Sequence, residues 1–153
     1  MSASTTRHTY TIKEAATLTG LPASTLRYYE SVGVIAPISR GASSKHRVYD
    51  EGDLDQLMWI ACLAATGMSV EDMRQYVANG QLGPSAAGDQ IELLVQQERR
   101  LAVEERQIAL RQRYVRLKID YWRAVESGDT ARAGLLSGEA RTLADQLKRA
   151  KRQ

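Results

Sequence analysis

The feature that most limits how this chain can fold is a stretch without proline or glycine, from about Asp89 to Glu126. Apolar residues recur in it every seven positions, while the companion positions of the repeat are apolar only at the two ends. A seven-residue repeat sustained over this length is typical of a long helix in a coiled coil. Because such a helix needs a partner, we expect a homodimer. The predicted interface residues are Leu94, Leu101, Ile108, Val115, Ile119 and Trp122.

The same helix carries a second apolar stripe, which consists of Val103, Leu110, Tyr114, Leu117 and Tyr121. One free helix cannot bury two stripes by itself, so this stripe also needs a cover. We expect that cover to come from a partner or, alternatively, from the helix folding back on the N-terminal part of its own chain.

A short final helix is predicted in the segment 128–153, after a break at Ser127-Gly128-Asp129. Its apolar residues are spaced as on one helical face, and its end is strongly basic, with the run Lys148-Arg149-Ala150-Lys151-Arg152. Such a tail is either simply solvated, the more frequent case, or contacts DNA or an acidic partner.

Two short helices are predicted at the start of the chain, over about 12–31. Thr11 and Glu14 have the spacing of a capping box, in which each side chain serves a free amide at the start of a helix. Gly20 gives a stop, and Pro22 suits the first turn of the next helix. Two short helices joined by a glycine-containing turn describe a helix-turn-helix.

A basic hairpin, or wing, is predicted over about 34–49. The β-prone pairs Val34-Ile35 and Val48-Tyr49 flank a tip rich in glycine and serine that holds Arg40, Lys45 and Arg47. A plain surface loop has the same composition, but the cations favour a wing that touches phosphate.

Two further helices complete a predicted DNA-binding domain over 9–79, which a linker at 80–88 separates from the long helix at 89–127. Asp50 and Ser69 are the expected N-caps of these two helices. In the first of them, the stripe Leu54, Leu57, Met58, Ala61, Ala64 and Ala65 is expected to face the core.

The excess of positive charge is concentrated near the N-terminus. The net charge is only +3, yet six cations oppose two carboxylates in residues 1–49. A basic first third fits a surface that faces phosphate.

Several classes of protein are disfavoured by what the sequence lacks. No apolar run approaches the length of a membrane span, and the start of the chain has no apolar signal core, so a cytoplasmic protein is expected. One cysteine and two histidines offer no metal site, and no cofactor motif or catalytic cluster is present. We therefore expect neither a cofactor nor an enzyme.

Five motifs in this order resemble the MerR family of bacterial transcription regulators. The resemblance covers residues 10 to about 126 and rests on the segments Tyr10–Ala16, Leu26–Glu30, Gly33–Ile35, Arg47–Tyr49 and Gly67–Val70. It implies a mainly α fold with a winged helix-turn-helix, a long antiparallel coiled-coil dimerisation helix and a short C-terminal helix.

The resemblance also implies a mechanism. Regulators of this family bind double-stranded promoter DNA as twofold dimers, at a palindrome between promoter elements that are too far apart. Activation bends and untwists the DNA so that RNA polymerase meets both elements, which makes the energy of DNA deformation part of the output. The residues expected at the DNA are Lys13, Thr25, Arg27, Tyr28, Arg40, Lys45, Arg47 and Tyr49.

The effector is less constrained than the DNA head. The segment around Cys62 resembles the aldehyde- and nitrosative-stress-responsive (AdhR/NmlR-like) branch of the family, which implies alkylation or oxidation of this thiol. Its helical neighbours at three and four residues are uncharged, so Cys62 can equally be a small buried apolar residue. Two alternatives remain: a small non-covalent ligand held between the dimer helix and the last helix, and an architectural DNA protein without an effector.

Overall fold

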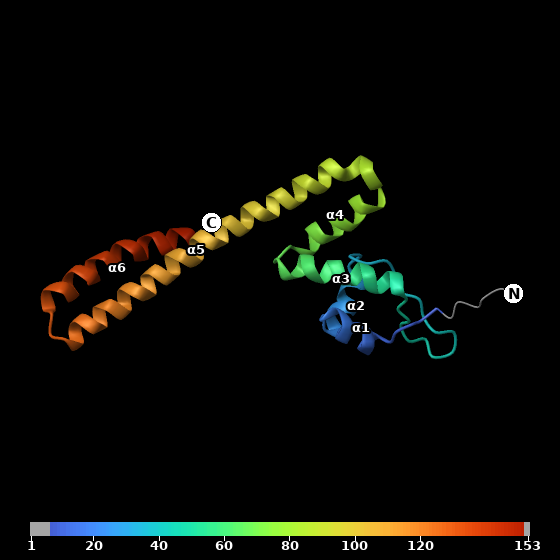
Figure 1. The fold of residues 1–153 in the computed structure, drawn as a ribbon, viewed down its shortest axis with the longest axis horizontal. Helices are drawn as coiled ribbons and strands as arrows, with labels where there is room; N and C mark the ends of the chain where they lie inside the picture. Colours follow the sequence, from blue (N-terminus) through green and yellow to red (C-terminus); the bar gives the residue numbers. More distant parts are fainter. Residues whose placement is uncertain (1–6, 152–153) are drawn as a thin grey trace. The chain divides into compact units, whose positions relative to one another are not determined.

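The computed structural model describes residues 7–151, which form two compact units that divide between Leu94 and Val95. The described chain is almost entirely helical (Figure 1). It contains the helices α1 (Ile12–Thr19), α2 (Ala23–Ser31), α3 (Glu51–Ala65), α4 (Val70–Gln81), α5 (Ala87–Glu126) and α6 (Thr130–Lys151), with a 3-10 turn at Gly83–Ala86. This architecture confirms the mainly α fold that the sequence predicts.

The helix-turn-helix is α1 and α2; its capping box and glycine stop act as predicted, whereas Pro22 lies at the N-cap of α2 and not in its first turn. The Thr11 hydroxyl accepts a hydrogen bond from the Glu14 amide, while the Glu14 carboxylate accepts one from the Thr11 amide. Gly20 ends α1 with φ +74°, a left-handed conformation that suits glycine. Leu26 and Tyr29 of α2 are buried in the core of the first unit.

The wing differs from the predicted hairpin in its pairing. Arg40 and Arg47 form an isolated antiparallel bridge, and the Val48 amide donates to the Ser39 carbonyl at 2.8 Å. Val34 and Ile35 do not pair with the descending arm; both are buried in the core. Tyr49 pairs instead with Tyr10, through two backbone hydrogen bonds of 2.8 and 2.9 Å. The wing is thus a loop tied at its base to the segment before α1.

Helix α3 begins at a second capping box, formed by Asp50 and Asp53. Its buried side chains are Leu54, Leu57 and Ile60, whereas Met58 and Ala65 are exposed. The predicted stripe was therefore wrong at Met58 and Ala65, and it omitted Ile60. Helix α4 begins after Ser69, whose hydroxyl accepts from the Asp72 amide, as the sequence predicts.

The chain between α4 and α5 is a tight turn fixed by an amide side chain. Gln90, in the first turn of α5, donates to the Tyr76 carbonyl at 2.8 Å and accepts from Asn79 at 3.2 Å. Asn79 is buried although it is polar, and Gln75 also donates to it. Side chains thus satisfy the polar groups at the end of α4.

Helices α5 and α6 form an antiparallel hairpin in the second unit (Figure 1). Leu117 and Ala124 of α5 pack with Ala133, Leu136, Ala140 and Leu143 of α6, and Leu110, Tyr114 and Tyr121 lie against this cluster. The second apolar stripe is therefore covered by the chain's own last helix, and not by a partner or by the N-terminal part of the chain as expected.

Helix α6 reaches back only as far as the middle of α5. Near its end, the Ala150 carbonyl accepts a hydrogen bond from the Gln107 side chain at 3.4 Å. Val103, one turn earlier in α5, is exposed because it lies beyond the reach of α6.

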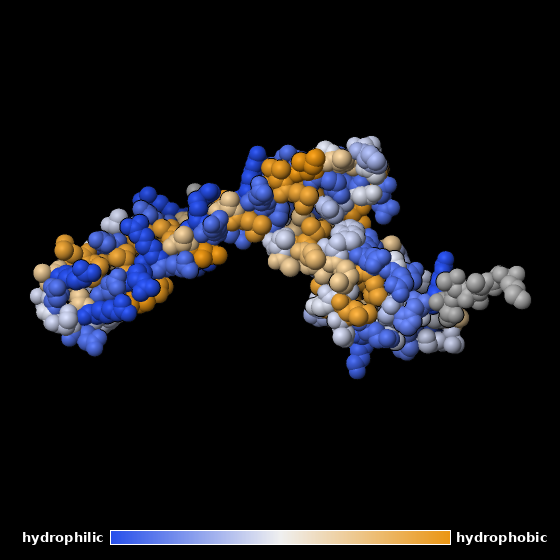
Figure 2. All heavy atoms as spheres, in the orientation of Figure 1, coloured by the Kyte–Doolittle hydropathy of each residue, from blue (hydrophilic) through white to orange (hydrophobic). Residues whose placement is uncertain are grey.

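The seven-residue repeat lies on the face of α5 that α6 does not cover. Leu94, Leu101, Ile108, Val115, Ile119 and Trp122 are between 39% and 63% exposed. Figure 2 shows apolar residues interleaved with charged ones on the surface of this helical hairpin. A regular row of exposed large apolar side chains is unusual for a helix that stays single.

Candidate DNA-binding surface

The exposed face of α2 carries the side chains that the sequence singled out. Pro22 precedes the helix, so Thr25 lies in its first turn, followed directly by Arg27 and Tyr28. Arg27 is exposed, Tyr28 is 51% exposed and Thr25 is half-buried. Leu26 and Tyr29 hold the opposite face in the core, which turns the guanidinium of Arg27 and the phenol of Tyr28 outward.

An ion pair ties the end of α2 to the wing. The Arg47 Nε donates to the Glu30 Oε2 at 2.8 Å, and the Ile38 amide donates to the Glu30 Oε1 at 3.2 Å. The two charged side chains are only 19% and 12% exposed. Burial raises the pKa of Glu30, but the hydrogen bonds from Arg47 and Ile38 outweigh it and hold the pKa below its usual value. Glu30 therefore stays charged and fixes the wing.

The tip of the wing is a tight turn with two exposed cations. The Arg40 Nη1 donates to the Lys45 carbonyl at 3.4 Å, and Lys45 has φ +57°. A Cβ on Gly41 would lie 2.5 Å from the Ser44 hydroxyl oxygen, so a larger residue there would displace the Ser44 side chain. The charge of Arg40 also helps to lower the pKa of Glu30.

Two predicted contact residues stand apart from this group. Tyr49 is fully buried, and its hydroxyl has no hydrogen-bond partner within residues 7–151. Its side chain belongs to the core and is not available to DNA in this structure, because the bridge to Tyr10 draws it inward. Lys13 is exposed on α1, where it lines a separate hollow of about 430 Å³ with Tyr10, Glu14, Thr17 and Leu18.

Sequence reasoning missed the role of Glu30. Its carboxylate was visible in the α2 motif, and Arg47 in the wing motif, but seventeen residues separate them. The only signal in the sequence that could have predicted this ion pair is the opposite charge of Glu30 in the α2 motif and Arg47 in the wing motif. The structure makes Arg47 the support of the wing, with one of its five N–H donors committed to Glu30.

Cys62 lies on α3 and is exposed. The interpretation of Cys62 as a buried apolar residue is therefore wrong. Its surroundings on the helix include the exposed Met58 and Trp59, and the Trp59 ring contacts the Tyr76 ring of α4 with centroids 5.5 Å apart.

Two features are absent from the described part of the chain. Within residues 7–151, no helix combines the length and the apolar character that crossing a membrane requires. The same residues contain no cluster of three or more histidine, cysteine, aspartate or glutamate side chains with the geometry of a metal site.

A helix-turn-helix with a tied, basic wing defines the class of winged DNA-binding regulators. Residues 10–80 match the family described as MerR HTH family regulatory protein. The chain is 32% identical over 129 residues to the uncharacterized HTH-type transcriptional regulator YyaN of Bacillus subtilis, a match that covers 76% of this chain and 92% of that protein. This chain belongs to the MerR family of DNA-binding transcriptional regulators.

Other relatives extend the comparison. The HTH-type transcriptional regulator AdhR of B. subtilis is 36% identical over 90 residues, which span 59% of this chain and 64% of that protein. The crystal structure of HiNmlR, a MerR family regulator lacking the sensor domain, bound to promoter DNA, is similar with a TM-score of 0.61 and 25% identity, over 84% of this chain and 96% of that chain. These relatives are transcriptional regulators, which confirms the prediction that the chain is not an enzyme.

Proposed function

We propose that the protein binds a palindromic promoter operator as a homodimer and controls transcription by bending and untwisting the DNA. The observation that carries this proposal is the Glu30–Arg47 ion pair, which ties α2, with its exposed Arg27 and Tyr28, to the wing, with its exposed Arg40 and Lys45. HiNmlR, with a similar fold, was crystallised on promoter DNA, which supports the same use of this surface.

Each side chain has a distinct role in the proposal. Arg27 and Tyr28 reach phosphate or base edges, with Thr25 beside them at the start of α2. Arg40 and Lys45 contact phosphate from the tip of the wing, and Arg47 adds the part of its guanidinium that Glu30 does not hold. Lys13 is a peripheral phosphate contact. Tyr49 is omitted because it is buried.

The exposed apolar row on α5 supports the homodimer, in which two DNA-binding heads bind one duplex. Smooth bending of a site of this size costs on the order of 1–6 kcal/mol. A sensor that shifts a few kcal/mol between two dimer geometries therefore changes the access of RNA polymerase to the promoter.

The test begins with selection of bound sequences from a randomised duplex pool, followed by affinity measurements at several salt concentrations. We expect twofold-symmetric sequences, and we expect Arg27→Ala to lower the salt slope of log Kd by about one unit per head. Arg132→Ala, an exposed arginine on α6, is the matched control and leaves the slope unchanged. Selected sequences without symmetry, or equal slopes for wild type and Arg27→Ala, would contradict the proposal.

Cys62 is the proposed sensor. Its thiol adds to the carbonyl carbon of a short aldehyde, and the thiol proton passes to the carbonyl oxygen to give a hemithioacetal, so no oxidant is required. The exposure of Cys62 on α3 and the similarity to AdhR support this role.

Promoter output in vitro, with and without a short aldehyde, tests the switch. Wild type is expected to respond and Cys62→Ser to lose the response while keeping its DNA affinity. A full response in Cys62→Ser would favour a non-covalent ligand instead. Constant affinity and bending for wild type under every compound tested would point to an architectural protein.

A further inference from the structure

We infer that two copies pair through α5 in one defined antiparallel register, in which the twofold axis crosses the helix between Arg106 and Gln107. This inference rests on the homodimer proposed above and on the antiparallel pairing that the family resemblance implies; what it adds is the alignment of the two helices. Four features of α5 support it: the division of charge between its two halves, the apolar residues at the two ends of the repeat, the two glutamates at core positions between them, and the charges that flank the core.

The charge of α5 is divided between its two halves. Residues 89–105 hold five acidic and two basic side chains, whereas residues 106–123 hold six basic side chains and one acidic side chain. Parallel pairing would set acidic half against acidic half and basic against basic. Antiparallel pairing sets each acidic half against a basic half, so the charge distribution selects the antiparallel orientation.

The apolar ends of the row then fix the alignment. Each repeat has two core positions: one in the row Leu94 to Trp122, and a companion position three residues before it. In an antiparallel coiled coil, a row position of one helix packs against a companion position of the other. With the axis between residues 106 and 107, Ile91 meets Trp122 of the second copy, and Leu94 meets Ile119 of the second copy. A shift of seven residues in either direction would move an end of the row beyond α5, which spans Ala87–Glu126, or against Glu126.

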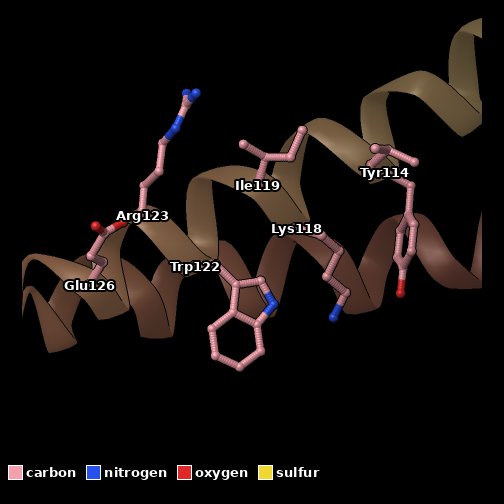
Figure 3. Close-up of a pocket in the computed structure, with 7 residues that line it drawn as sticks. Tyr114, Lys118, Ile119, Trp122, Arg123 and Glu126 are labelled. Carbon is pink, nitrogen blue, oxygen red and sulfur yellow. The ribbon is translucent and has the colours of Figure 1, made fainter.

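A hollow on α5 lies where the inferred register places the second copy. It has a volume of about 440 Å³ and is lined by Val115, Ile119 and Trp122, with Tyr114, Lys118, Arg123 and Glu126 around them (Figure 3). Trp122 is the most exposed member of the row, at 63%. In the inferred register, Ile91 and Leu94 of the second copy occupy this hollow, and the indole becomes buried.

The same alignment accounts for the two glutamates that interrupt the row. Glu98 and Glu105 occupy core positions of the repeat, where a carboxylate needs a cation beside it. The inferred register places Lys118 of the second copy beside Glu98, and Arg111 of the second copy beside Glu105. Polar core residues of this kind specify register at some cost in stability.

The flanking residues exclude the neighbouring registers. Glu104 faces Arg111 of the second copy in the inferred register, and both side chains are exposed without an ion-pair partner in residues 7–151 of their own chain. A shift of seven residues one way would place Arg111 against Arg111, and the opposite shift would place Glu104 against Glu104. Both alternatives set like charges together at the axis.

Disulfide trapping tests the register. In a Cys62→Ser background, Glu98→Cys/Val115→Cys places two thiols opposite each other across the interface, and mild oxidation is expected to give a covalent dimer. The matched control, Glu98→Cys/Trp122→Cys, keeps the same first site but offsets the pair by seven residues, about 10 Å along the helix. That distance exceeds the reach of a disulfide, so the control stays uncross-linked.

Charge reversal gives an independent readout by sedimentation. Arg111→Glu is expected to weaken the dimer by roughly tenfold, since two symmetric attractions become repulsions. Adding Glu104→Arg is expected to restore part of the affinity. Arg106→Glu, the same change on the outer face of α5, is the control and has little effect.

The outcomes separate the register from the dimer itself. Suppose that the wild type is a dimer, but that the control variant cross-links and Glu98→Cys/Val115→Cys does not, or that neither variant cross-links. Either result would overturn the register and leave the proposed function standing. A wild-type protein that sediments as a single chain would overturn both. Circular dichroism of each variant confirms that helical content is retained before cross-linking is interpreted.

Discussion

Replacing Glu30 with glutamine tests whether one carboxylate holds the wing on the helix-turn-helix. Glutamine keeps the shape and the oxygen that accepts from the Ile38 amide, but it removes the charge opposite Arg47. The pair is 2.8 Å long and its side chains are 12% and 19% exposed, so solvent screens it weakly. Hydrogen bonds to charged groups at such sites contribute about 1.5–3 kcal/mol. We expect Glu30→Gln to lower the free energy of unfolding by about this amount.

The matched control is Glu71→Gln. Its partner Arg74 lies at 3.4 Å on the same helix, and the two side chains are 81% and 50% exposed. Exposed pairs of this kind contribute about 0–1 kcal/mol. Urea unfolding at pH 7 and one fixed protein concentration, followed by circular dichroism, measures both variants. Equal losses for the two variants would refute the claim that the burial of the Glu30–Arg47 pair makes it strong.

The pH dependence follows from the pKa of Glu30, which lies below its usual value in the folded protein. Because the folded pKa is lower than the unfolded one, about 4.3, the carboxylate contributes fully above that unfolded value. The contribution is lost as the pH falls through the folded pKa. The stability difference between wild type and Glu30→Gln is therefore expected to be constant near neutral pH and to shrink in acid below about pH 4. A difference that grew in acid would contradict the assignment.

Three further substitutions have defined expectations. Tyr49→Phe removes a buried hydroxyl that has no hydrogen-bond partner in residues 7–151. The free energy of unfolding should therefore stay equal or rise by about 1 kcal/mol, and operator affinity should not change. A loss of affinity would show that Tyr49 contacts DNA. Leu136→Ala should cost about 2–5 kcal/mol in thermal or urea unfolding because Leu136 packs between α5 and α6, whereas its 73% exposed neighbour Leu135 should tolerate alanine. Gly20→Ala should destabilise the head by about 1 kcal/mol, measured in the same way, because φ is +74° there and alanine is strained.

Local signals in the sequence were enough to predict the helix starts. Thr11, Asp50 and Ser69 each act within three residues of the amide that they serve, so residue type and spacing contain the necessary information. The left-handed stop at Gly20 is equally local. Helix positions and the order of elements in the head followed from these signals.

Contacts between distant segments were not predictable in the same way. The strand-like pairing of Tyr49 with Tyr10 spans thirty-nine residues, and nothing in either segment specifies the other. The buried face of α3 was misjudged because that helix is apolar nearly all round, so periodicity alone could not choose between Met58 and Ile60. The seven DNA-contact residues that stay in the proposal remain predictions, since they come from motif position rather than from a bound duplex.

The point at which α6 stops has a mechanical consequence for the inferred dimer. Helix α6 ends beside Gln107, so it braces only the half of α5 that follows. In the inferred register, that braced half lies against the bare half of the other copy. Every cross-section of the paired rod then contains three helices, so no stretch of the rod is thinner or more flexible than the rest. Such a rod would resist flexure evenly, and a force applied at one end would reach the other with little loss.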